Sequence, residues 1–245
     1  MTYILLAVIV LIGFTTEATI GFGATLISLT LAANIISVND FLPIFVPVNY
    51  GLFLYVTITH RKHIRWDIVT RRIMPAMGLG VPIGLAMFNF ADPNILKTIY
   101  SLFVIGLSAV VLVRLVRNPD VPDRPLPMII RYPLLFFAGI MHGMYSLGGP
   151  IVVYNLAREN VNKMAFRATA CFIWLVLGTV LLINFAATGL LTRDSLIKGA
   201  GLAVPLMVAI FLGEWLSGRV NEHLFRMAVF IVLLLAGVVL LINPA

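Results

Sequence analysis

Cysteine and charge are both scarce in this chain. Its single cysteine, Cys171, excludes a disulfide within the chain and a thiolate metal site, and is expected to be a small packing residue. Charged residues make up 11% of the sequence and hydrophobic residues 61%, whereas soluble domains are about one quarter charged and one half apolar. This balance excludes an ordinary soluble domain and predicts a single all-α integral membrane domain over residues 1–245.

Several catalytic and metal-binding motifs are also missing. The histidines have no metal-ligand spacing, and the sequence contains no HExxH, no Walker A motif and no Gly-x-Ser-x-Gly nucleophile elbow. We therefore expect no metal, no cofactor, no ATP-driven step and no enzyme activity.

The net charge of +7 would suggest nucleic acid as the partner of a soluble protein. Here the basic residues cluster in short loops beside apolar runs, so membrane topology explains them better. We expect membrane lipid, and no nucleic acid, around this chain. Its first residues lack the basic segment of a signal peptide, so the first apolar run is expected to be retained.

Long apolar runs are what the sequence has in abundance. A membrane-crossing helix needs roughly 20 apolar residues. Two further apolar segments, 3–36 and 132–157, each contain a glycine-rich interruption. The chain is therefore predicted to hold two copies of one unit, a broken helix followed by three full spans: repeat one over 1–116, a proline-rich linker over 117–131 and repeat two over 132–245. The full spans are predicted at about 41–60, 73–91, 95–116, 165–187, 196–217 and 224–243.

The two interruptions have matching features. The first reads Gly-Phe-Thr-Thr-Glu-Ala-Thr-Ile-Gly-Phe-Gly-Ala over 13–24, and the second reads Gly-Ile-Met-His-Gly-Met-Tyr-Ser-Leu-Gly-Gly-Pro over 139–150, 126 residues later. A break leaves backbone N–H and C=O groups that lipid cannot satisfy, so it must line a polar cavity enclosed by protein. Matched breaks in two halves are typical of a transporter's substrate site. Close helix packing through small residues is the alternative.

The basic residues favour one of two topologies. If each broken segment returns to the side from which it entered, 14 basic residues lie in the cytoplasm and 3 outside; if both cross fully, 11 lie inside and 6 outside. The positive-inside bias favours the first version. Each half then makes three crossings, so the halves form an inverted-topology repeat with both termini outside.

The substrate is expected at the ends of the broken helices. Free N–H groups and the positive dipole end of a half-helix attract a small anion, and glycines let it approach the main chain closely. Pro150 suits the first turn of such a half-helix. The predicted substrate-binding residues are Thr16, Thr19, Gly21, Phe22, Gly23, Asn49, His142, Tyr145, Ser146, Gly148, Gly149, Pro150 and Arg167.

Three ionisable residues have two interpretations each. Glu17 is either a buried proton-coupling group, because apolar surroundings disfavour its charged form, or a cap of the half-helix nearer the surface. His142 either donates to the anion and carries a coupling proton, or is a neutral packing residue. Arg167 either pairs with the anion through its donor fork or extends to the cytoplasmic interface.

The order of these features resembles a known family. An early glycine-rich break, a later Gly-Gly-Pro break and the run Lys-x-x-Phe-Arg-x-Thr over 163–169 are similar to the sulfite/organosulfonate exporter family (TauE/SafE) along nearly the whole chain. The resemblance implies about eight hydrophobic segments and export of sulfite, sulfoacetate or related sulfur-containing anions. The chain departs from the family in its first break, which is poorer in glycine and contains Glu17. The substrate region that the resemblance implies includes Gly21, Gly23, Gly148, Gly149, Pro150 and Arg167.

The sequence thus predicts a multi-pass transporter of the bacterial inner membrane that exports a small anion, sulfite or an organosulfonate such as sulfoacetate, by alternating access. The alternatives are an anion channel built on the same breaks and a membrane subunit that scaffolds a partner without transport. Import in place of export, coupling to a second ion and a homodimer are left open.

Overall fold

Helices make up all the regular structure in the part of the chain that the computed structural model describes, namely residues 2–20, 23–33, 35–117, 125–159, 161–216 and 222–242. The elements are α1 (Thr2–Ile20), α2 (Ala24–Ala32), α3 (Val38–Thr59), η1 (Arg61–His63), α4 (Trp66–Ile68), η2 (Val69–Ile73), α5 (Met74–Phe90), α6 (Pro93–Arg117), α7 (Met128–Tyr145), α8 (Gly149–Ala157), α9 (Lys163–Ala187), α10 (Arg193–Leu216) and α11 (Glu222–Ile242).

The prediction of a multi-pass, all-helical chain is confirmed. Five helical stretches of the described residues are long and apolar enough to cross a bilayer, and they correspond to α3, α4–α5, α6, α9 and α10. The predicted span 224–243 falls on α11, where the described apolar stretch, Phe230–Val239, is shorter than a full crossing. The span predicted to begin at residue 73 begins earlier, at Trp66, because the single π-helical turn η2 extends the helix through Arg71 and Arg72.

Local sequence explains where several helices begin. Ser37 precedes α3, and its hydroxyl accepts a hydrogen bond from the Asp40 N–H at 3.1 Å. Asn162 does the same for α9, where its side-chain oxygen accepts from the Ala165 N–H at 2.8 Å. Such caps satisfy amides that have no partner in the first helical turn.

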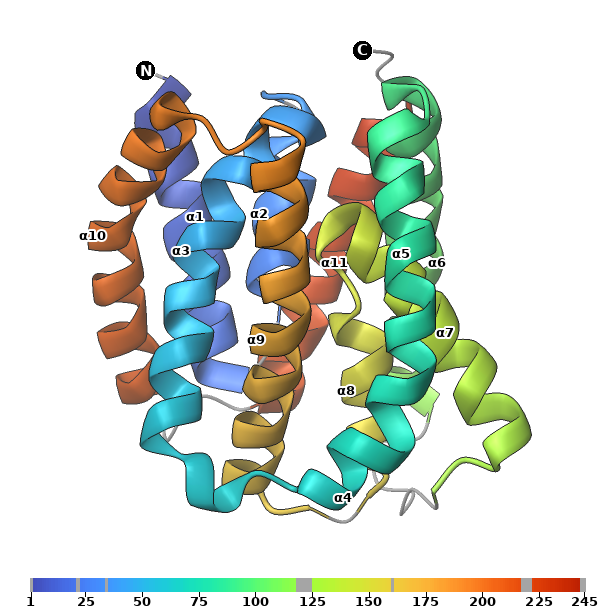
Figure 1. Ribbon diagram of the computed structural model, residues 1–245. Helices are drawn as coiled ribbons and strands as arrows, with labels where there is room; N and C mark the ends of the chain where they lie inside the picture. The colour runs from blue at the N-terminus through green and yellow to red at the C-terminus, as the bar shows by residue number, and fades with distance from the viewer. Residues whose placement is uncertain are drawn as a thin grey trace.

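The path of the chain can be followed in Figure 1. Helix α1 starts at the upper end of the bundle and α2 leads back towards that end, after which α3 descends, α5 rises and α6 descends. Helix α7 rises from the lower end and α8 leads back down, after which α9 rises, α10 descends and α11 rises. Helix α6 ends and α7 begins at the lower end. The linker predicted over 117–131 ends earlier than expected, because α7 already begins at Met128, and residues 118–124 lie outside the described part.

Helices from the two ends of the chain pack side by side. Helix α1 packs on α10, α7 on α5, α3 on α9 and α6 on α11. Each of these pairs joins a helix of the first half of the chain to one of the second half. The core between them includes a stack of Phe14, Phe45 and Phe41, with ring centroids 5.1 and 5.2 Å apart.

Helices α5 and α7 approach so closely that their backbones touch. A Cβ atom placed on Gly80 or Gly84 of α5 would overlap the carbonyl oxygen of Phe136 or Ile140 in α7. A Cβ on Gly139 or Gly143 of α7 would overlap backbone carbonyl oxygens of α5. Glycines spaced four apart on both helices thus form a small-residue crossing typical of membrane proteins.

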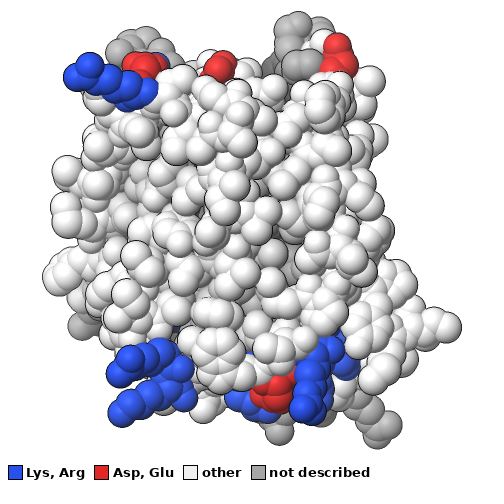
Figure 2. Space-filling view, in the orientation of Figure 1, with Lys and Arg blue, Asp and Glu red and all other residues white. Residues whose placement is uncertain are grey.

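The outer surface suits a lipid surrounding. Large apolar side chains such as Leu79, Phe90 and Phe211 are at least 70% exposed, far more than a soluble monomer tolerates across a whole surface. On the face drawn in Figure 2, a broad uncharged band separates Lys, Arg, Asp and Glu at the two ends, with most of the visible basic side chains at the lower end.

An ion cluster fixes the lower end of α7 and the loop after α8. Glu159 contacts Arg72 and lies 3.4 Å from Arg131, and the Glu159 and Arg131 side chains are only 8% and 9% exposed. Arg131 also donates to the Leu126 carbonyl at 2.8 Å. The cluster thereby ties the start of α7 and the end of η2 to the segment that follows α8.

Replacing Glu159 by Ala should destabilise the fold by about 3 kcal/mol, because it leaves the buried Arg131 guanidinium without its carboxylate. The matched control is Asp194→Ala, which removes the exposed Asp194–Lys198 pair and should cost less than about 1 kcal/mol. Thermal unfolding of both variants in detergent measures the difference. Equal midpoints would show that the buried cluster adds no stability.

Candidate functional site

The first helix interruption turns the chain back within the bundle. Helix α1 ends at Ile20 and α2 begins at Ala24. Gly23 has a φ of 112°, a left-handed conformation that a side chain would strain. The predicted site residues Gly21 and Phe22 lie outside the described residues.

Glu17 caps the helix that follows this turn. Its Oε2 accepts a hydrogen bond from the Ala24 N–H, the first amide of α2, at 2.8 Å. The residue is also buried, with 5% of its surface exposed. The sequence offered burial and capping as alternatives for Glu17, and the structure shows both together. A carboxylate at a helix N-terminus is stabilised by the free amides and by the helix dipole.

The second interruption has a similar form. Helix α7 ends at Tyr145 and α8 begins at Gly149. Ser146 adopts the left-handed conformation, with φ 58°, and its N–H donates to the His142 carbonyl at 2.7 Å. A non-glycine residue in this region is uncommon and is often found at ligand sites.

Both breaks are shorter than the sequence suggested. Gly13, Gly139 and Gly143 were expected within the interruptions, but each lies inside a helix, where it faces a neighbouring helix at close range. Gly13 faces Ala24 and Ser28 of α2, and the other two face α5. For these three glycines the alternative of close packing is the one that the structure supports.

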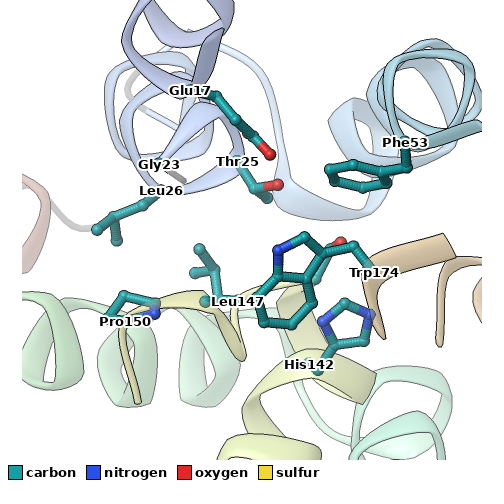
Figure 3. A pocket seen from close by; sticks show the side chains of 11 residues that line it. Glu17, Gly23, Thr25, Leu26, Phe53, His142, Leu147, Pro150 and Trp174 are labelled. Atoms are coloured by element: carbon teal, nitrogen blue, oxygen red, sulfur yellow. The ribbon is translucent and has the colours of Figure 1, made fainter. Parts of the chain in front are cut away.

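The two turns face one small cavity (Figure 3). The Glu17 carboxylate and the Thr25 hydroxyl enter it from one side, and His142 and Trp174 from the other. Helix α3 adds Phe53. The lining residues are Glu17, Gly23, Thr25, Leu26, Phe53, His142, Ser146, Leu147, Gly149, Pro150 and Trp174.

His142 is the most unusual group in this cavity. It is 2% exposed, and among the described residues neither ring nitrogen has a hydrogen-bond partner. Its imidazole stacks on the Trp174 indole, with centroids 5.5 Å apart and planes 13° apart. A buried polar group without a partner costs about 1–3 kcal/mol, so a ligand that bonds to His142 recovers that cost.

Several predicted site residues do not line the cavity. The Thr16 and Thr19 hydroxyls donate to carbonyls of their own helix, Ile12 at 2.9 Å and Thr15 at 2.7 Å. Tyr145 is buried against Tyr100, with ring centroids 5.1 Å apart.

Three further predicted residues lie behind or beside the lining. Gly148 packs against Met77 and the Ala138 carbonyl. Asn49 is buried, and its Nδ2 donates to the lining Thr25 hydroxyl at 3.4 Å. Arg167 is half-buried and attracts the Glu17 carboxylate electrostatically without lining the cavity.

Five lining residues are not among the predicted site residues. One of them, Thr25, directly follows the first interruption. Leu26, Phe53 and Leu147 are ordinary apolar residues with no sequence signal. Trp174 did have a sequence signal, because it lies in the middle of a predicted span, whereas tryptophans of membrane proteins concentrate at the interfaces.

The geometry is that of a small, buried, mixed polar and apolar site where two interrupted helices meet inside an apolar bundle. The model of the sulfite exporter TauE/SafE family matches residues 5–240 of the 245-residue chain. No curated protein and no solved structure matches it. The chain thus belongs to the sulfite exporter TauE/SafE family, a family of membrane transporters.

Proposed function

We propose that this protein is a secondary transporter that exports a small anion, sulfite or an organosulfonate such as sulfoacetate, from the cavity between the two turns. One observation carries the proposal. Two helix interruptions more than 100 residues apart in sequence meet at a single buried cavity, which also holds an unpartnered histidine. Interrupted helices inside a membrane bundle are a recurrent way to build a substrate site.

The start of α8 is the proposed binding point for the negative charge. The first amides of a helix have no intrahelical partner, and none of the described side chains caps those of α8. Gly149 and Pro150 both line the cavity there, and Ser146 adds a hydroxyl. His142 supplies a further hydrogen bond to an anionic oxygen.

The pairing of helices supports an inverted repeat. If the halves are repeats, α1 corresponds to α7, α3 to α9, α5 to α10 and α6 to α11. Under this correspondence the packed pair α1–α10 becomes α7–α5, which is also a packed pair. The same correspondence maps the pairs α3–α9 and α6–α11 onto themselves. The halves enter from opposite ends of the bundle, which favours repeats of opposite topology over 1–116 and 132–245 (Figure 1).

The lower end of the bundle is proposed to face the cytoplasm of a bacterial cell. Its loops and helix ends contain most of the basic residues, whereas the described basic residues of the upper loops are few. The lower group includes Arg61, Lys62, Arg65, Arg71, Arg72, Arg114, Arg117, Arg131, Arg158 and Arg167.

Transport by alternating access would rock one set of helices against the other around this fixed site. A monoanion that leaves an inside-negative cell by itself gains about 2.3 kcal/mol per 100 mV, so the membrane potential can drive its export. If a proton leaves with the anion, the potential contributes nothing and the concentration gradients of the anion and the proton set the direction.

The test is efflux of sulfite and of sulfoacetate from proteoliposomes that contain only the purified chain. We expect saturable efflux at a carrier rate, and selective thermal stabilisation of the detergent-solubilised protein by the transported anion. Sulfate and a simple carboxylate are the comparison ligands. Single-channel currents would favour an anion channel instead, and absence of flux with every anion would favour a scaffold subunit.

A further inference from the structure

The starts of the two half-helices differ in one respect. The first amide of α2, that of Ala24, is bound by the Glu17 carboxylate. At α8 the corresponding turn contains Pro150, which has no N–H, and no described side chain caps the helix. One helix end therefore already holds an anion that belongs to the protein, whereas the other is open to the cavity.

This built-in anion shares its cavity with the proposed substrate. Glu17 and Gly149 both line the cavity, and Figure 3 shows the carboxylate directed towards the space between Thr25, Phe53 and Trp174. Like charges repel strongly where water is scarce. A substrate anion at the start of α8 and an ionised Glu17 at the start of α2 therefore repel each other across the shared cavity.

We infer that the ionised Glu17 carboxylate disfavours the substrate anion, which therefore binds together with one proton taken up by this carboxylate. The inference rests on the proposed function and extends it to the coupled ion. The proton comes from water and forms an O–H bond on Glu17, which weakens the bond that the carboxylate accepts from the Ala24 N–H. On the other side of the membrane the anion and the proton both return to water, so each cycle moves no net charge.

The charged and titratable side chains around Glu17 decide which residue can carry the coupled proton. Helix α9 presents the charged Arg167 and the titratable Cys171 near Glu17. The Arg167 guanidinium attracts the Glu17 carboxylate when the site is empty. Helix α7 presents His142, the second group able to take up a proton.

The remaining neighbours offer no further candidate among the described side chains. Helix α2 contains no titratable residue, and α3 contributes Phe53 to the cavity. On α10, which packs against α1 where Gly213 meets Ala18, the described titratable side chains lie in the first turns at the opposite end of the helix. They are Arg193, Asp194 and Lys198.

The first experiment measures binding of methanesulfonate to the full chain in detergent by calorimetry between pH 5 and 8. Methanesulfonate is the anion of a strong acid, so its own charge stays constant. In the wild type we expect the Kd to rise with pH by up to about tenfold per unit once Glu17 is ionised, because each anion then requires one proton.

Glu17→Gln should abolish this pH dependence and keep the affinity that the wild type has at low pH. The Gln oxygen still accepts the Ala24 N–H, so the turn is retained. Asp194→Asn, at the exposed end of α10, should behave like the wild type. His142→Gln should bind more weakly but keep the pH dependence. If His142→Gln loses the pH dependence and Glu17→Gln keeps it, the proton belongs to His142 and the inference is overturned.

The second experiment measures how the methanesulfonate flux in proteoliposomes responds to an imposed membrane potential. Wild-type methanesulfonate flux should not respond to the potential, since a proton accompanies the anion. In Glu17→Gln the anion moves alone, and its equilibrium ratio should shift by up to about fiftyfold per 100 mV. A wild type that responds as strongly as the variant would refute the coupling while leaving anion transport intact. A wild type that neither binds nor moves any anion would refute both the coupling and the proposed function.

Discussion

Gly149→Leu should reduce anion efflux by at least about a hundredfold, because even small misplacement at a binding site has effects of this size. Gly149 opens α8 at the edge of the cavity, and a Cβ atom there would lie 3.9 Å from Trp174 Cζ2. That distance is an ordinary contact, so one methyl group fits. The branched end of Leu would occupy the space between the start of α8 and Trp174, where the anion is proposed to bind.

Two variants serve as controls for this result. Gly149→Ala should retain most of the flux, since its single added carbon meets no neighbour closer than 3.9 Å. Gly106→Leu places the same side chain on α6, where a Cβ would meet nothing within 4 Å, and should leave flux unchanged. Efflux from proteoliposomes compares the three variants, and their unfolding temperatures show whether each one is folded. Wild-type flux in Gly149→Leu would place the substrate elsewhere.

The second large effect concerns the crossing of α5 and α7. Gly84→Ala should destabilise the protein by about 3 kcal/mol or more, at or above the upper end of ordinary overpacking. The added methyl group would overlap the Ile140 carbonyl and come within 2.9 Å of the Gly143 Cα. Because both are backbone atoms, neither can move aside by changing a rotamer.

Gly78 on the same helix provides the matched control. A Cβ on Gly78 would meet nothing within 4 Å, so Gly78→Ala should change stability by no more than about 1 kcal/mol, in the stabilising direction that the higher helix propensity of Ala favours. Thermal unfolding of both variants in one detergent gives the comparison. Equal stability of the two variants would mean that α5 and α7 separate easily and that their contact is not part of the fixed core.

The helices were predictable because composition and span length are strong signals in membrane proteins. A run of about 20 apolar residues has few alternatives to a crossing helix. The ends were less predictable where charged residues continue a helix beyond the hydrocarbon region, as Arg71 and Arg72 do in η2. The inverted arrangement of two repeats stays a prediction, supported by the helix pairing.

The site was predictable in outline and not in detail. The Gly-x-Gly signal falls between the end of α1 and the start of α2, and the Gly-Gly-Pro signal falls at the start of α8, since glycine and proline mark breaks in apolar segments. They did not separate the glycines that bend the chain from Gly139 and Gly143, which serve the crossing with α5. Phe53 and Trp174 join the cavity from α3 and α9, and only packing across the bundle brings them there.

The exchange of partners between the two halves has a consequence for biosynthesis. Helix α1 is made first, yet its packing partner α10 begins only at Arg193. The first half must therefore stay in the bilayer with exposed small-residue and polar faces until the second half has left the ribosome. Insertion and assembly thus become separate stages, and until α10 arrives the hydrogen bond from the Ala24 N–H of α2 is the one described contact within the first half that satisfies the Glu17 carboxylate.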